Sequence, residues 1–171
     1  MAPVFKEHGG IESIALIGNY LPRMCGIATF TTDLAEAMTA EAPHENCWVV
    51  AMNDIPVGYE YPDKVRFEIN QNKLSEYDTA AEFLSVHHTD IVCVQHEYGI
   101  FGGTAGSHLL KLLEELRMPV VTTLHTVLKE PSPEYREVML KLAALSDKLI
   151  VMSRKAVDML QQIYRIPEEK I

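Results

Sequence analysis

The sequence has few cysteines and no long apolar run. Cys25, Cys47 and Cys93 are its three cysteines, and no two of them have CxxC spacing. An odd number without metal-ligand spacing indicates neither a disulfide framework nor a zinc knuckle, so buried thiols are the simpler interpretation. No stretch approaches the roughly 20 apolar residues that cross a bilayer, and the amino-terminal MAPVFKEHGG has no apolar signal-peptide core. We therefore expect a cytoplasmic protein without a transmembrane segment.

Positive charge is also scarce. The chain carries 15 Lys and Arg against 24 Asp and Glu, which gives a formal net charge of -9. An acidic surface repels nucleic acid and anionic membranes, so neither is expected as the main partner. The expected binding partner is therefore a small molecule or another protein.

Three familiar motifs of nucleotide-binding proteins and hydrolases are missing. The glycine-containing loop near the amino terminus lacks GxGxxG, which disfavours a nicotinamide or flavin dinucleotide site, and GxxxxGK[ST] occurs nowhere. The stretch GTAGSH around Ser107 does not fit the GxSxG nucleophile elbow, so a serine hydrolase is disfavoured as well.

What the sequence does contain is a regular alternation of short apolar runs and longer stretches with helical periodicity. This pattern predicts β-α units around a parallel sheet, with helices on both faces because the runs are continuously apolar. The length of 171 residues suits one domain, so we expect an α/β, Rossmann-like fold over residues 1–171. The predicted strands are Ser13 to Gly18, Cys47 to Met52, Asp90 to Gln95, Pro119 to Leu124 and Lys148 to Ser153, with Val65 to Ile69 as a weaker sixth.

Serines mark several of the predicted helix starts. Ser75 with Asp78 resembles a capping box, and Ser132 precedes a first-turn Pro133. Ser153 precedes another helical pattern, while Thr104 or Ser107 is expected to begin a leucine-rich helix. The final IPEEKI is typical of a turn into a further strand, so we expect the sequence to end at a domain boundary.

Polar and glycine-rich segments follow the predicted strands. In open α/β sheets, ligands bind outside the carboxyl ends of the strands, so these segments are the candidate site. They are GNYLPRMCGIATF with Arg23 and Gly26, QHEYGIFGG with Glu97, Tyr98, Gly99, Gly102 and Gly103, the pair His125 and Thr126, and the pair Ser153 and Arg154.

Several of these residues allow two interpretations. His125 can hydrogen-bond a polar ligand close to its ordinary pKa, or it can be a satisfied core histidine. Arg23 leads into a helix amino terminus that attracts phosphate, or it is a solvated surface residue. Gly102 and Gly103 let backbone approach a ligand or only shape a tight loop. Glu97 is the better functional candidate than His96, which is expected to be a hydrogen-bonded structural histidine.

The chain resembles the amino-terminal half of group 1 (family 4) glycosyltransferases, including mannosyltransferase-like members. The resemblance rests on motifs in the order LPRMCGIATFTTDLAEAM, QHEYGIFGG, VVTTLHTVL, LAALSDKLIVMS and IYRIPEEKI. It implies the GT-B architecture, in which two Rossmann-like domains face each other across a cleft. It also implies that this chain is the first of them and that the carboxy-terminal, donor-binding domain is absent. Where many relatives have two adjacent glycines in the first loop, this chain has Cys25, Gly26 and Ile27.

In that family the loop around Gly26 lies near the donor diphosphate, and the histidine equivalent to His125 lies by the transferred sugar. The resemblance therefore implies the acceptor-side half of a retaining, metal-independent glycosyltransferase, with a nucleotide sugar as substrate and no cofactor. The acceptor would be a sugar or a glycoconjugate. The candidate catalytic residues are His125 and Glu97, and the candidate substrate-binding residues are Arg23, Gly26, Tyr98, Gly99, Gly102, Gly103, Thr126, Ser153 and Arg154.

Two other functions remain open from the residues alone. The first is a stand-alone flavodoxin-like module that binds a small ligand or a protein without catalysis. The second is a metal-dependent hydrolase, in which His96, Glu97 and His125 would form a site of two histidines and one carboxylate.

Overall fold

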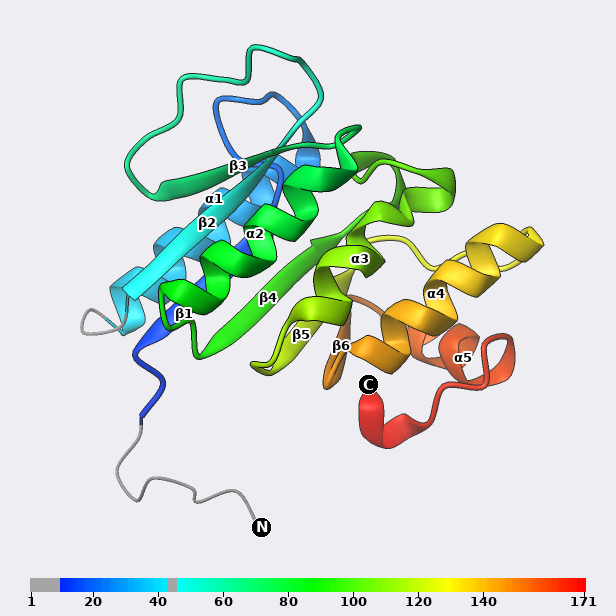
Figure 1. The fold of residues 1–171 in the computed structure, drawn as a ribbon. Helices are drawn as coiled ribbons and strands as arrows, with labels where there is room; N and C mark the ends of the chain where they lie inside the picture. The colour runs from blue at the N-terminus through cyan, green and yellow to red at the C-terminus, as the bar shows by residue number, and fades with distance from the viewer. Residues whose placement is uncertain (1–9, 43–45) are drawn as a thin grey trace, which may run out of the picture.

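Six parallel strands form the centre of the computed structural model, which describes residues 10–42 and 46–171. Their order in the sheet is β3-β2-β1-β4-β5-β6, the order found in doubly wound Rossmann folds (Figure 1). The strands are β1 (Ser13–Gly18), β2 (Asn46–Asn53), β3 (Val65–Asn70), β4 (Ile91–His96), β5 (Val120–Leu124) and β6 (Lys148–Val151).

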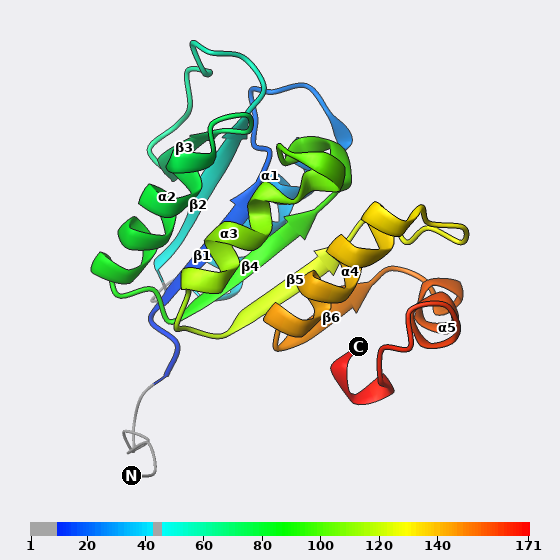
Figure 2. The same ribbon diagram turned by 45° about the vertical axis from the view of Figure 1, so that its right-hand side comes forward.

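Helices cover both faces of this sheet. The helices are α1 (Gly26–Glu41), α2 (Leu74–Val86), α3 (His108–Glu115), α4 (Pro133–Leu145) and α5 (Arg154–Gln162). Three short 3-10 turns, η1 (Tyr98–Ile100), η2 (Thr104–Gly106) and η3 (Glu168–Lys170), complete the described elements. Helices α2, α3 and α4 lie side by side on one face, and α1 packs on β1 and β2 from the other (Figures 1 and 2). The predicted α/β, Rossmann-like fold is therefore confirmed.

The core explains why the strands read as continuous apolar runs. On β2, Trp48 and Val50 belong to the apolar cluster under α2 and α3, while the alternating Val49 and Ala51 belong to the cluster under α1. Because both faces of the strand are covered, both sets of side chains are buried. All six predicted strands are present, with ends that differ from the prediction by at most two residues.

One predicted helix start is wrong. Helix α2 begins at Leu74, with Lys73 as its N-cap and without a side-chain capping hydrogen bond, so Ser75 does not cap it. Instead, Glu76 fixes this turn, because its carboxylate accepts a 2.6 Å hydrogen bond from the Asn70 amide and contacts the Lys73 ammonium at 2.9 Å. With Lys73 as the N-cap, Glu76 is the third residue of the helix and still lies in the first turn, where an acid is favourable.

The other predicted starts agree with the structure. Ser153 N-caps α5 and accepts a hydrogen bond from the Ala156 amide. Ser107 and Ser132 are the N-cap residues of α3 and α4, although neither side chain bonds the helix backbone. Thr104 begins the separate turn η2.

The parallel order brings the candidate site to one edge. β1 and β4 are neighbours although they are far apart in the chain, and the carboxyl ends of β1, β4, β5 and β6 point the same way. The segments that follow these strands therefore lie along a single edge, as expected for the loops holding Gly26, Glu97, His125 and Ser153. Within the described residues, no helix combines the length and the apolar character needed to cross a membrane.

Candidate functional site

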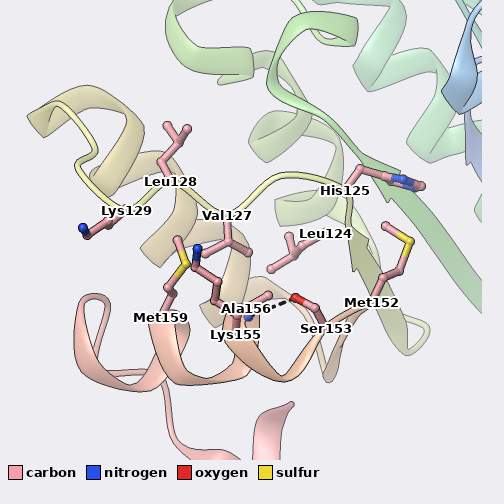
Figure 3. Close-up of a pocket in the computed structure, with 10 residues that line it drawn as sticks. All are labelled: Leu124, His125, Val127, Leu128, Lys129, Met152, Ser153, Lys155, Ala156 and Met159. Carbon is pink, nitrogen blue, oxygen red and sulfur yellow. Dashed lines mark hydrogen bonds between the residues drawn. The ribbon is translucent and has the colours of Figure 1, made fainter.

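Two cavities adjoin each other at the carboxyl edge of the sheet, and His125 lines both. The first, of about 590 Å³, lies between the loop after β1, the start of α1 and the segment after β4; Arg23, Gly26, Glu97 and Gly99 are among its lining residues. The second, of about 420 Å³, lies between the loop after β5 and the start of α5, and includes Ser153 (Figure 3). We call the pair of cavities the edge groove.

His125 is held in place from three sides. Its backbone amide donates to the His96 carbonyl at 3.0 Å, and its Nε2 lies 3.0 Å from Oε1 of the fully buried Gln95. The ring of Phe30 packs edge-on against it, with 4.8 Å between centroids. Because an amide oxygen only accepts, this contact puts the ring proton on Nε2 and leaves Nδ1 as an acceptor. Burial lowers the pKa of His125, and the Glu97 carboxylate opposes the shift only in part. The imidazole is therefore neutral near neutral pH.

Glu97 joins the segments that follow β4 and β5. Its Oε1 accepts a 3.0 Å hydrogen bond from the Tyr98 amide, and its Oε2 accepts a 2.5 Å hydrogen bond from the Thr126 hydroxyl. Both bonds fix the orientation of the half-buried carboxylate where it lines the first cavity. Thr126 thus contributes to the site by holding Glu97.

The amino terminus of α1 opens into the first cavity. Cys25 is the N-cap residue, and its Sγ accepts hydrogen bonds from the Ala28 amide at 3.4 Å and from Asn19 Nδ2 at 3.2 Å. Gly26 begins the helix, and a Cβ added there would meet no atom within 4 Å. The first amides of a helix have no partner inside the helix, and its dipole favours an anion at this end.

Arg23 is neither a solvated surface residue nor a cation without a partner. Its guanidinium donates to the Asn19 side chain at 2.9 Å and to the Met52 carbonyl at 3.2 Å, and forms an ion pair with Asp54 at 3.3 Å. Only 13% of the side chain is exposed. Arg23 therefore ties the loop after β1 to the end of β2, with its charge already paired, at the wall of the first cavity.

The glycines after β4 differ from one another. Gly99 is exposed in the first cavity, and an added Cβ would meet no atom within 4 Å. At Gly102, a Cβ would lie 1.8 Å from the Gln71 carbonyl oxygen, and at Gly103 it would meet Ser107 and His108. Gly103 also has a φ of 78°, which an L side chain rarely adopts. Gly102 and Gly103 allow close packing of protein on protein here and do not line the edge groove.

Two further candidates also lie away from the groove. Tyr98 is buried, with its ring edge-on to His96 and to Tyr135. Arg154 lines a different cavity beside Ile150 and Ile171, whereas its neighbour Ser153 lines the second cavity of the groove. The structure thus brings Arg23, Gly26, Glu97, Gly99, His125 and Ser153 to the groove, with Thr126 behind Glu97.

The expectation of a hydrogen-bonded His96 is wrong. The side chain is completely buried, and neither ring nitrogen has a hydrogen-bond partner in the described part of the chain. It is stacked on Phe101 and edge-on to Tyr98, and burial lowers its pKa to about 3. Among residues 10–42 and 46–171, no three His, Cys, Asp or Glu side chains group in a way that could hold a metal ion. The ligand set required by the metal-dependent hydrolase hypothesis is therefore not assembled.

Sequence reasoning missed several residues that line the groove or support its side chains. Phe30 and Gln95 set the position of His125, and Lys129, Met152, Lys155 and Met159 line the second cavity. A polar residue within an apolar strand could have drawn attention to Gln95. The lysines and methionines of the second cavity have no pattern in the sequence, because the cavity forms only when α5 packs beside the loop after β5.

Comparisons with known proteins identify the family. No curated protein matches the chain in sequence. Among solved structures, one described as the solution structure of a phosphate-loop protein is 14% identical over 88% of this chain and 87% of that chain, with a TM-score of 0.34, too low to carry a conclusion. The family model described as Glycosyltransferase Family 4 matches residues 24–171, which include all residues that line the edge groove except Asn19 and Arg23. The chain therefore belongs to Glycosyltransferase Family 4 and has a glycosyltransferase-type function.

Proposed function

We propose that this chain is the acceptor-side domain of a retaining glycosyltransferase, which moves a sugar from a nucleotide sugar to an acceptor hydroxyl. One observation carries the proposal: in a family 4 glycosyltransferase domain, a neutral imidazole, an oriented carboxylate and a helix amino terminus line one cavity. Glycosyl transfer needs positive dipoles for the leaving diphosphate and hydrogen-bonding groups for the sugar hydroxyls.

The leaving diphosphate would lie at the start of α1. Gly26 leaves open space at this end of the helix, so an anion can approach the first amides closely. Arg23 already pairs with Asp54, so its role is to hold the loop. The dipole of α1, and not a free arginine of this loop, would stabilise the charge that develops as the bond between the anomeric carbon and the diphosphate breaks.

His125 and Glu97 would hold hydroxyl groups of the transferred sugar and of the acceptor. The hydrogen bond to Gln95 leaves His125 Nδ1 as an acceptor, and the bonds to Tyr98 and Thr126 fix the Glu97 carboxylate. Groups held in this way need little rearrangement during the reaction, which is the main source of their catalytic effect. The acceptor oxygen then bonds to the anomeric carbon on the face that the diphosphate leaves, and its proton passes to the departing diphosphate.

A second, donor-binding domain completes the proposal. The edge groove is open, and exclusion of water around a donor requires a facing surface. We infer that a following α/β domain supplies that surface and most contacts to the nucleotide, as in the GT-B architecture.

The test compares this 171-residue chain with a polypeptide that also carries the proposed second domain. Calorimetry with a panel of nucleotide sugars measures binding, and product analysis measures transfer. We expect weak or undetectable nucleotide binding by the chain alone, and binding with transfer by the longer polypeptide. Tight nucleotide binding together with turnover by the 171-residue chain would contradict the division of roles. Ligand binding without transfer by either polypeptide would favour a binding module.

A further inference from the structure

The second cavity of the edge groove has a local charge opposite to that of the chain. Its ten lining residues include two lysines, Lys129 and Lys155, and no aspartate or glutamate, although acidic residues outnumber Lys and Arg by 24 to 15 over the sequence. A positive cavity on an acidic protein attracts anions selectively, because the surrounding surface repels them.

Neither lysine is neutralised by the protein. In the part of the chain that the structure describes, neither Lys129 nor Lys155 takes part in an ion pair or a side-chain hydrogen bond, whereas Lys73, Lys111 and Lys141 all pair with carboxylates. Both ammonium groups are therefore available to a ligand. The first turn of α5, with Ser153 and Ala156 in the lining, adds the positive end of a helix dipole.

The cavity is also divided by polarity along its length. Figure 3 shows Lys155 rising from α5 into the cavity and Lys129 on the loop beyond Leu128, whereas His125 and Met152 lie at the opposite end. Between the two ends lie the apolar side chains of Val127 and Leu124, and Met159 adds a further apolar side chain beside Lys155 (Figure 3). A ligand that fits has an anionic group at one end, an apolar surface in the middle and a hydroxyl that reaches His125.

We propose that this cavity binds the acceptor, and that the acceptor carries an anionic group, a phosphate or a carboxylate, held by Lys129 and Lys155. The apolar face of the acceptor sugar packs on Val127 and Met159, which leaves a hydroxyl directed toward His125. The role of the bound molecule as an acceptor rests on the proposed glycosyl transfer. The anion site itself does not depend on that reaction. Lysine provides compact point charges that suit either anionic group.

The experiment titrates the 171-residue chain with three probes and follows its amide resonances by NMR at low salt. Glucose 6-phosphate and glucuronate are the two anionic probes, and methyl α-glucoside is the neutral control. We expect both anionic probes to shift resonances of the lining residues and to bind more weakly as salt is raised. The tighter of the two identifies phosphate or carboxylate as the preferred group.

Two variants assign the effect to the lysines. The double substitution Lys129→Met and Lys155→Met keeps the side chains long and apolar, and should weaken binding of the anionic probes about three- to tenfold. Lys141→Met removes one positive charge elsewhere, on α4, and should leave binding unchanged. Equal binding of the neutral probe, no binding of either anionic probe, no effect of the double variant, or an equal effect of Lys141→Met would each overturn the proposal.

Failure here is distinguishable from failure of the proposed function, because no nucleotide sugar is present in the titration. Loss of the lysine-dependent anion binding with intact transfer by the longer polypeptide would remove the anionic acceptor and leave the transferase. Lysine-dependent anion binding without any transfer would keep the anion site and contradict the proposed transferase function.

Discussion

At the scale of single residues, His125 lines both cavities and is fixed by its contact with the buried Gln95. We predict that His125→Ala in the complete enzyme raises the barrier to transfer by about 2 to 4 kcal/mol, as for removal of a hydrogen bond made in the transition state. The ring is only partly buried, so unfolding should change far less. Steady-state kinetics and thermal unfolding of the same preparations check this. Unchanged turnover, or a stability loss large enough to explain the loss of activity, would favour a structural histidine.

The burial of His96 leads us to predict that the stability of the fold depends on pH. In the unfolded chain this ring takes up a proton near pH 6.5, whereas in the fold burial lowers its pKa to about 3. Between these values the unfolded state binds more protons, so the contribution to stability is complete above about pH 6.5 and falls by at most about 1.4 kcal/mol for each pH unit below it. Urea unfolding at pH 7, 5.5 and 4.5 measures this slope.

The variant His96→Phe isolates the effect of the ring. Phenylalanine keeps a flat ring between Phe101 and Tyr98, cannot be protonated and removes two unpaired polar atoms. We expect equal or higher stability at pH 7 and a shallower loss of stability in acid than in the unmodified chain. An identical slope in both proteins would show that other groups cause the acid sensitivity.

At the scale of elements, the segment between β4 and α3 depends on one close contact between distant parts of the chain. Gly102 packs on the Gln71 carbonyl oxygen, 1.8 Å from where a Cβ would be, so Gly102→Ala forces the backbone apart and should cost at least about 2 kcal/mol. Gly99→Ala is the matched control, because a Cβ there meets no atom within 4 Å and should change stability by no more than about 0.5 kcal/mol. Chemical unfolding of both variants tests the difference. Equal stability losses would refute the packing role of Gly102.

The strands and the position of the groove could be predicted from the sequence, but the close contact of Gly102 could not. The strands were predictable because helices cover both sheet faces and each strand is therefore continuously apolar, as Trp48 to Met52 illustrate. The groove edge followed from the parallel order, since polar residues after parallel strands collect on one side. The packing of Gly102 on Gln71 was not predictable, because the partner lies 31 positions earlier in the chain.

Side-chain partners were the other part that could not be read from the sequence. A hydroxyl residue followed three positions later by an acid matched a capping box at Ser75, but Glu76 made competing contacts with Asn70 and Lys73 and set the helix start. The sequence position of Arg23 also gave no sign of its ion pair with Asp54, which lies 31 positions later. In both cases a side chain has several possible polar partners, and the folded backbone determines which of them it contacts.

At the scale of the whole molecule, one sheet carries both apolar clusters, since alternate residues of β1 and β2 belong to each. We therefore predict that the 171-residue chain unfolds in a single cooperative step. Trp48, the only tryptophan, is fully buried on β2, while circular dichroism reports on all helices. Urea transitions followed by tryptophan fluorescence and by circular dichroism should coincide. Two separate midpoints would indicate that the β5-β6-α5 end unfolds independently.

The shared position of His125 has a consequence for how such a protein can diversify. The first cavity draws its lining from residues 19–30 and 97–100, and the second from residues 124–159, with His125 as their one common member. Substitutions in the later stretch can therefore alter which molecules enter one compartment while the other keeps its shape. Under the proposed assignment of the second cavity to the acceptor, a few exchanges around α5 would change the acceptor and leave the residues beside α1 in place. An exchange at His125 would alter both cavities at once, because this residue lines both.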